Sequence, residues 1–249
     1  MESVTLAFCP RNGLCSENIY PFHFVAIWPT PGAGRRFVYM AKKLLIATHN
    51  SGKVREFSRM LSAPDFDVAF EVVGLGDLGI DLDVEETGTT FEENAVLKAR
   101  AYAKVSGVLT LADDSGLSVD ALDGAPGIHS ARYGGGGLDD EGRVRLLLAN
   151  MESVPGWDRT ARFIAVLALV GAELNGLPGA QGGLVTSEGT LEGAIVHQPI
   201  GSNGFGYDPV FWLASRAKTT AQLSGPEKDA VSHRGVALRG LIRALESLS

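Results

Sequence analysis

The sequence is short of cysteine, of clustered histidine and of long hydrophobic runs. Its 249 residues include two cysteines, Cys9 and Cys15, so the rest of the chain can form neither a disulfide nor a thiolate metal site. The five histidines contain no i, i+4 pair, which disfavours a zinc site on a helix. The longest apolar run, Phe163–Val170, has eight residues, whereas a membrane-spanning helix needs about 20. We therefore expect a cytoplasmic protein with no membrane contact.

Basic charge is also scarce. The formal net charge is −7, which excludes a general binder of nucleic-acid polymers because the phosphate backbone would be repelled outside a local basic site. With 45% hydrophobic and 20% charged residues, the composition is that of an ordinary globular protein. The length suits one large domain or two lobes and is ample for a sizeable core.

The first 39 residues differ from the rest of the chain. They hold both cysteines and several prolines, and they show no sustained period of a strand or a helix. At Met40 the pattern changes to Ala-Lys-Lys and then to a buried strand. We predict that residues 1–39 are a leader outside the fold and that residues 40–249 form the domain. An upstream start codon and an organelle-targeting segment are two explanations left open.

Hydrophobic periodicity predicts alternating strands and helices, followed by a cluster of strands. Strands are expected at 43–48, 68–73, 108–112, 117–122, 160–170 and 210–213, and a hairpin or meander at 184–196. Helices are expected at 53–61, 89–105, 139–151 and 225–248. This order indicates an α/β protein with a mixed central sheet, flanked by helices and arranged as two lobes.

A glycine-containing turn joins the first expected strand to the first helix. Such a turn presents free backbone N–H groups and the positive end of the helix dipole, which together attract anions. Lys53 adds a mobile positive charge, and Asn50 or Ser51 is placed to cap the helix. The spacing is not that of a Walker P-loop. An ordinary capped helix with a surface lysine remains the alternative.

Acidic residues occur in two places. Asp113-Asp114-Ser115-Gly116 follows the strand expected at 108–112, and side chains beyond the carboxyl ends of such strands commonly face a cleft. Glu85-Glu86-Thr87-Gly88 forms a second acidic turn. One or two carboxylates, completed by phosphates and water, are the usual protein ligands of Mg²⁺. The alternatives are a simple turn and a solvated face.

A glycine-aromatic loop and a basic helix complete the set. The loop at 201–209 allows close approach of its backbone to a ligand, and Phe205 or Tyr207 is suited to stack on a planar base, while Asp208 is suited to accept a ring N–H. Lys228 and Ser232 share a helix face. A tight hairpin and an amphipathic helix are the alternatives for these two pieces. Taken with the anion turn and the carboxylates, they predict a nucleoside polyphosphate bound with Mg²⁺.

Several motifs resemble those of the Ham1/RdgB family of inosine/xanthosine triphosphate pyrophosphatases. They are Ala-Thr-His-Asn-Ser-Gly-Lys at 47–53, Glu-Thr-Gly at 86–88, Phe-Glu-Glu-Asn-Ala at 91–95 with Lys-Ala at 98–99, Ala-Asp-Asp-Ser-Gly-Leu at 112–117, Gly-Ala-Pro-Gly-Ile-His-Ser-Ala-Arg-Tyr at 124–133, Gly-Phe-Gly-Tyr-Asp-Pro at 204–209 and Ser-His-Arg-Gly at 232–235. The resemblance implies two lobes around an active-site cleft in a homodimeric, Mg²⁺-dependent enzyme. Such an enzyme hydrolyses noncanonical purine nucleoside triphosphates (ITP, dITP and XTP) to the monophosphate and pyrophosphate.

The resemblance also implies roles for single residues. Asp114 matches the family's catalytic proton acceptor, and Glu86 and Asp114 match its metal ligands. The expected substrate contacts are Thr48, His49, Asn50, Ser51, Gly52, Lys53, Lys98, Ser115, Phe205, Gly206, Tyr207, Asp208, Lys228, His233 and Arg234. The preferred substrate, the rejection of GTP and the dimer interface are left open. A Maf-like nucleotide pyrophosphatase acting on other bases and a nucleotide-binding regulator without turnover are the alternatives.

Overall fold

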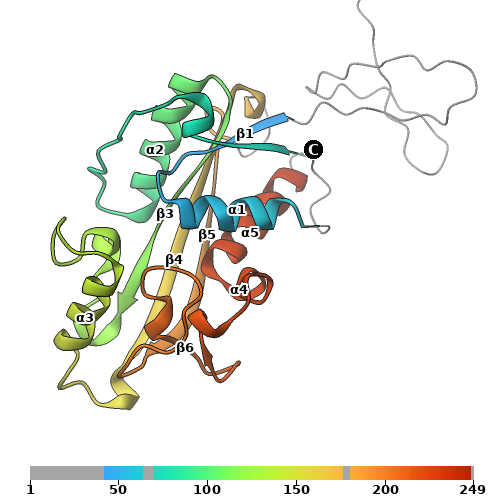
Figure 1. The fold of residues 1–249 in the computed structure, drawn as a ribbon. Helices are drawn as coiled ribbons and strands as arrows, with labels where there is room; N and C mark the ends of the chain where they lie inside the picture. Colours follow the sequence, from blue (N-terminus) through green and yellow to red (C-terminus); the bar gives the residue numbers. More distant parts are fainter. Residues whose placement is uncertain (1–41, 64–69, 176–179, 248–249) are drawn as a thin grey trace, which may run out of the picture.

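A single seven-stranded sheet forms the centre of the computed structural model, which describes residues 42–63, 70–175 and 180–247 (Figure 1). The strands are β1 (Lys42–Ile46), β2 (Phe70–Gly74), β3 (Leu109–Val119), β4 (Thr160–Val170), β5 (Leu184–Ile195), β6 (Phe211–Leu213) and β7 (Lys218–Thr219), in the order β2-β1-β3-β4-β5-β6-β7. β1 is parallel to β2 and β3, and every later pairing is antiparallel. The mixed sheet is therefore confirmed, whereas the leader expected at 1–39 lies outside the described residues.

Helices cover both faces of the sheet. They are α1 (Ser51–Leu61), α2 (Phe91–Ser106), α3 (Asp140–Asn150), α4 (Gly225–Val231) and α5 (His233–Ser247). α1 and α5 pack on one face around Leu167 of β4, and α2 packs on the other around Val166. A third apolar cluster fills the opposite end of the sheet, where α3 meets β6. These clusters give the molecule its two ends. Within the described ranges no helix is long and apolar enough to cross a membrane.

A crevice is expected where β1 ends and β3 continues. β1 pairs with β3 only as far as Ile46 opposite Leu111, after which Ala47 N donates to Leu111 O at 2.8 Å. Of the described strands, only β4 then pairs with β3 as it runs on to Val119, and an isolated bridge joins Ser118 to Pro126 near its end. The chain leaves β1 through α1 on one face and enters β3 through α2 on the other. Such a reversal is the point at which open α/β sheets bind ligands.

Three expectations about the elements are wrong in detail. Asp113–Gly116 lies inside β3 rather than beyond a strand, because the apolar strand β4 pairs with it residue by residue. The stretch expected as a hairpin or meander at 184–196 is one long strand, paired with β4 over its whole length. The final helix is broken at Ser232, whose extended backbone separates α4 from α5.

Candidate active site

The turn after β1 is organised by Asn50. Its Oδ1 accepts hydrogen bonds from Gly52 N at 2.8 Å and Lys53 N at 3.1 Å, which makes it the N-cap of α1. Thr48 Oγ1 in turn accepts from Asn50 N at 3.1 Å. Since Asn50 occupies two of the N–H groups, the positive charge at this end of α1 comes from the helix dipole and from Lys53.

Lys53 is directed at β3. Its Nζ lies 2.6 Å from Asp113 Oδ2, which also accepts from Ser115 Oγ at 2.9 Å. Burial lowers the pKa of Lys53, and the cations of Arg234 and Lys98 add to this, against the attraction of Asp113. Burial alone would raise the pKa of Asp113, but Lys53 and Arg234 hold it well below its usual range. Asp113 is therefore a fixed negative charge among cations.

A second charged group lies on the α2 side. Lys98 Nζ lies 2.6 Å from Glu86 Oε1 and 2.9 Å from Asp114 Oδ1, while Asn94 Nδ2 donates to Asp114 Oδ2 at 3.3 Å. Burial raises the pKa of Asp114, against the opposing effect of Lys98. Burial also disfavours ionised Glu86, but Lys98 and Arg132 keep the pKa of that carboxyl low. Two neighbouring carboxylates thus differ in basicity, and Asp114 is the one that holds a proton more readily.

Both charged groups hold the same stretch of β3. Alternation along a strand sends Asp113 and Ser115 toward α1 and Asp114 toward α2. Lys98 joins the two sides, because its Nζ also donates to the backbone oxygen of Asp113 at 2.9 Å. The structure therefore brings Lys53, Glu86 and Asp114 to the part of β3 that continues past the end of β1.

Phe205 occupies the other side of the α1 N-terminus. Lys228 Nζ and Arg234 Cζ each lie 5.1 Å from the centre of its ring. A Cβ on Gly52 would come within 2.6 Å of Phe205 Cδ1, so the ring packs directly on the first turn of α1. Lys228 and Arg234 are buried, and Phe205 is half-buried. The ring thus packs against a helix terminus and lies near two cations.

The two residues after Gly206 are turned inward. Tyr207 is buried in the core near α3, and its hydroxyl donates to Ser130 O at 3.0 Å. Asp208 accepts from Phe205 N at 2.9 Å, from Thr220 Oγ1 at 2.9 Å and from Lys228. In this structure both residues hold the loop in shape, so Phe205 rather than Tyr207 is the candidate for base stacking.

Three more residues expected to contact the substrate, His233, Gly206 and His49, lie in different environments. His233 stacks on Phe163 with a centroid distance of 4.8 Å, and burial lowers the pKa of its imidazole well below the ordinary value, so the ring is neutral. Gly206 N donates to Asp140 Oδ2 at 2.9 Å. His49 is exposed, and its Nε2 lies 3.0 Å from Leu82 O.

Glu56 is a buried acid that the sequence analysis missed. Its Oε1 lies 2.7 Å from Lys228 Nζ and its Oε2 lies 3.0 Å from Arg234 Nη1. Burial opposes ionisation of this group, but Arg234 and Lys228 lower the pKa of Glu56 overall. A signal was available, because Gly52, Glu56 and Met60 follow at helical spacing on the buried face of α1. An acid within a buried stripe indicates a cation partner.

The carboxylates fit a magnesium ion. Over the ranges that the structure describes, no three His, Cys, Asp or Glu side chains gather into a metal site. Glu86 and Asp114 nevertheless converge on the Lys98 ammonium, and Mg²⁺ commonly takes only one or two carboxylates from a protein. Asp113 Oδ1 is also buried without a partner in the described part of the chain, but Asp113 points toward α1 and so lies on the other face of β3 from Asp114. Hard oxygen donors of this kind suit Mg²⁺.

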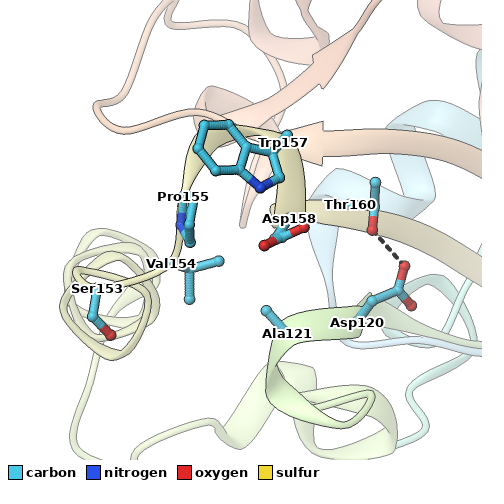
Figure 2. Close-up of a pocket in the computed structure, with 8 residues that line it drawn as sticks. All are labelled: Asp120, Ala121, Ser153, Val154, Pro155, Trp157, Asp158 and Thr160. Atoms are coloured by element: carbon cyan, nitrogen blue, oxygen red, sulfur yellow. Dashed lines mark hydrogen bonds between the residues drawn. The ribbon is translucent and has the colours of Figure 1, made fainter.

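A separate hollow of about 500 Å³ lies away from these groups (Figure 2). Trp157, which is 81% exposed, and Pro155 form one side of it, and on the other side Thr160 Oγ1 donates to Asp120 Oδ2 at 2.7 Å. None of the expected site residues lines this hollow. The position of this hollow therefore gives no reason to move the candidate site away from β3.

Comparisons with known proteins identify the family of the chain. A sequence model of the Ham1 family matches residues 44–244. The dITP/XTP pyrophosphatase of Bacillus licheniformis is 46% identical over 205 residues, which span 82% of this chain and 98% of that protein. The dITP/XTP pyrophosphatase of Escherichia coli K12 is 46% identical over 206 residues, spanning 83% and 99%.

Solved structures show the same likeness. The Ham1 protein of Staphylococcus aureus aligns with a TM-score of 0.69 at 41% identity, covering 84% of this chain and 100% of that one. The dITP/XTP pyrophosphatase of Mycobacterium abscessus aligns with a TM-score of 0.59 at 43% identity, covering 83% and 98%. The family model matches most of this chain, and the relatives are similar over nearly their whole lengths. The chain therefore belongs to the Ham1 family.

Proposed function

We propose that this protein hydrolyses noncanonical purine nucleoside triphosphates (dITP, ITP and XTP) to the monophosphate and pyrophosphate. The observation that carries the proposal is the meeting of Lys53, Glu86 and Asp114 on one stretch of β3. Relatives named for dITP and XTP hydrolysis, at 46% identity over most of this chain, support it.

The triphosphate would lie at the end of β1. Lys53 and the dipole of α1 offer positive charge there, and Lys228 lies beside the same turn through Phe205. Negative charge develops on the departing pyrophosphate, so fixed cations stabilise the transition state more than the substrate. The side chain of Lys53 is only 14% exposed, which strengthens this effect because little water screens its charge.

In this proposal Asp114 accepts the proton of the attacking water. Its carboxylate is held by Lys98 and Asn94, and burial raises its pKa, which makes it a better base than an exposed aspartate. As the water oxygen bonds to the α-phosphorus, the bond to the α,β-bridging oxygen breaks and pyrophosphate leaves. Mg²⁺ bound through Glu86 and Asp114 would supply charge neutralisation on the phosphate oxygens.

Base selectivity would come from the Phe205 side. Phe205 supplies a stacking surface, the buried Arg234 lies 5.1 Å from the centre of its ring, and His233 is the neighbour of Arg234 in the chain. Inosine and xanthine carry an acceptor at C6, whereas adenine carries a donor. A donor fixed opposite C6 would be left unpaired by adenine, at a cost of roughly 1–3 kcal/mol per lost partner.

Further parts of the proposal rest on the family resemblance and on composition. We propose a homodimer that requires Mg²⁺ and works in the cytoplasm, with residues 1–39 as a leader. Hard oxygen ligands support the metal requirement, and the scarcity of cysteine supports the compartment. Gel filtration with light scattering tests the dimer, and intact-mass measurement of native material tests the leader.

The decisive experiment separates pyrophosphate from orthophosphate. dITP, XTP, ITP, dATP, GTP and dTTP are incubated with the full chain, with Mg²⁺ or with EDTA, and both products are assayed. We expect pyrophosphate from dITP, ITP and XTP, only with Mg²⁺, and a loss of roughly 10²- to 10⁴-fold in kcat for Asp114→Asn. The exposed Asp158→Asn serves as the matched control and keeps the wild-type rate.

Other outcomes would replace the proposal. Preference for dTTP would favour a Maf-like enzyme, orthophosphate alone a phosphatase, and binding without product a regulator. Near-normal turnover by Asp114→Asn would show that another group accepts the proton.

A further inference from the structure

Glu86 is held by a cation on each side of its carboxylate. Oε1 lies 2.6 Å from Lys98 Nζ, and Oε2 lies 2.6 Å from Arg132 Nη1. Glu86 belongs to neither a helix nor a strand, because it lies in the segment between Leu78 and Phe91. Its orientation therefore depends on these two side chains rather than on a regular backbone.

Arg132 is itself firmly attached. It ends the 3₁₀ helix η3 (Gly127–Arg132), in which Ser130 Oγ accepts from Leu117 N of β3 at 2.8 Å. The Tyr207 hydroxyl donates to Ser130 O at 3.0 Å, so η3 is tied both to β3 and to the loop that carries Phe205. The guanidinium thus reaches Glu86 from an anchored backbone.

The pair contributes little to stability. Arg132 is 49% exposed at its side chain, and ion pairs open to solvent in this way add little to the free energy of unfolding. The bond from Arg132 to Glu86 is also directional, because a guanidinium holds one carboxylate oxygen in its own plane. A carboxylate offers about four lone-pair positions, so the bonds to Lys98 and Arg132 leave others open.

We infer that Arg132 is a positioning residue that holds the Glu86 carboxylate ready for a divalent cation. The inference rests on the proposed function, which makes Glu86 a metal ligand. Groups that hydrogen-bond a metal-binding carboxylate typically change metal affinity or activity by about 10- to 100-fold when removed. Arg132 acts through Glu86 and needs no contact with the nucleotide.

The test compares Arg132→Gln, Arg132→Lys and wild type in the full chain. Mn²⁺ binding without nucleotide is titrated by electron paramagnetic resonance, and the Mg²⁺ dependence of dITP hydrolysis is measured separately. We expect Arg132→Gln to weaken Mn²⁺ binding and to raise the half-activating Mg²⁺ concentration by roughly 10- to 100-fold. KM for dITP at saturating Mg²⁺ should change little, and Arg132→Lys should restore part of the affinity.

Arg145→Gln is the matched control. Arg145 is an exposed arginine of α3 paired with Glu141, so the variant should leave both metal measurements at wild-type values. Equal Mn²⁺ affinity in wild type and Arg132→Gln overturns the inference, as does a wild type that binds no Mn²⁺. If wild type binds Mn²⁺ in an Arg132-dependent manner but releases no pyrophosphate from dITP, the proposed function fails while the positioning role stands.

Discussion

At the scale of single residues, Glu56 shows how the site is held together. A buried carboxylate is unfavourable unless cations compensate it, and Glu56 has two, Lys228 and Arg234. The same two cations lie against the ring of Phe205. Glu56 therefore fixes the positions of both cations relative to the aromatic ring, although it need not contact the nucleotide.

Glu56→Gln tests this arrangement through its pH dependence. Removing one partner of a buried pair should lower the free energy of unfolding at pH 7 by roughly 3–5 kcal/mol. Because Arg234 and Lys228 lower the pKa of Glu56, its stabilising contribution is full above the unfolded-state value of about 4.3 and is lost as the pH falls through the lower folded value. Urea unfolding from pH 7 to pH 3 should therefore show the difference between wild type and variant shrinking at low pH.

The control for this prediction is Glu141→Gln. Glu141 is an exposed acid of α3 in contact with Arg145, and its removal should change stability little at any pH. A Glu56→Gln deficit that stayed constant down to pH 3 would mean that the carboxylate charge is not what stabilises the cluster.

Local sequence patterns identified some of these residues and missed others for a physical reason. Asn50 as a cap was predictable because its partners are two and three residues away. The buried stripe of α1 indicates that Glu56 has a cation partner, but it does not identify that partner, because Lys228 is 172 positions distant and only the folded chain joins them. The expected metal and substrate roles of Glu86 and Lys53 stay predictions.

At the scale of elements, the first turn of α1 needs a glycine at position 52, because neighbouring side chains occupy the space of a Cβ. A Cβ at Gly52 would lie 2.6 Å from Phe205 Cδ1 and 2.9 Å from Asn50 Oδ1. Gly52→Ala should therefore displace the ring and raise KM for dITP by roughly tenfold, equivalent to about 1.4 kcal/mol. Steady-state kinetics measure the effect, with circular dichroism to confirm folding.

Gly137→Ala is the matched control. A Cβ at Gly137 meets nothing within 4 Å, so KM and stability should stay at their wild-type values. An unchanged KM in a folded Gly52→Ala variant would show that Phe205 does not contact the base.

Element type was easier to predict than element extent. The strand at 160–170 and the helix at 139–151 are confirmed within a residue or two, because their apolar patterns are long. β3 was cut short at Ala112 because Asp113 and Asp114 are polar, and such residues normally end a strand. Pairing with β4 and the ion pairs with Lys53 and Lys98 override that local preference.

At the scale of the whole molecule, the candidate site joins the two ends of the sheet. Lys53, Glu86 and Asp114 lie beside the apolar clusters around α1 and α2, whereas the Phe205 loop belongs to the end that holds α3 and β6. A nucleotide that contacts both should favour the native arrangement of each end.

Ligand binding should therefore raise thermal stability. With Mg²⁺ and the nonhydrolysable α,β-methylene analogue of dITP at 100 times its Kd, we expect about 2.7 kcal/mol of added stability. Differential scanning fluorimetry measures the shift in Tm. Lys53→Ala should lose most of the shift, and Trp157→Ala, in the hollow of Figure 2, should keep it. An equal shift with the corresponding dATP analogue would contradict selection by the base.

The uninterrupted course of β3 has a consequence for how this chain tolerates changes in length. Asp113 and Asp114 serve different faces only because side chains alternate along the strand. Deleting one residue between Leu109 and Asp113 would exchange their environments and move each acid away from its lysine. A substitution here alters one contact at a time. A one-residue shift in the register of β3 would instead break the ion pairs of Asp113 and Asp114 together.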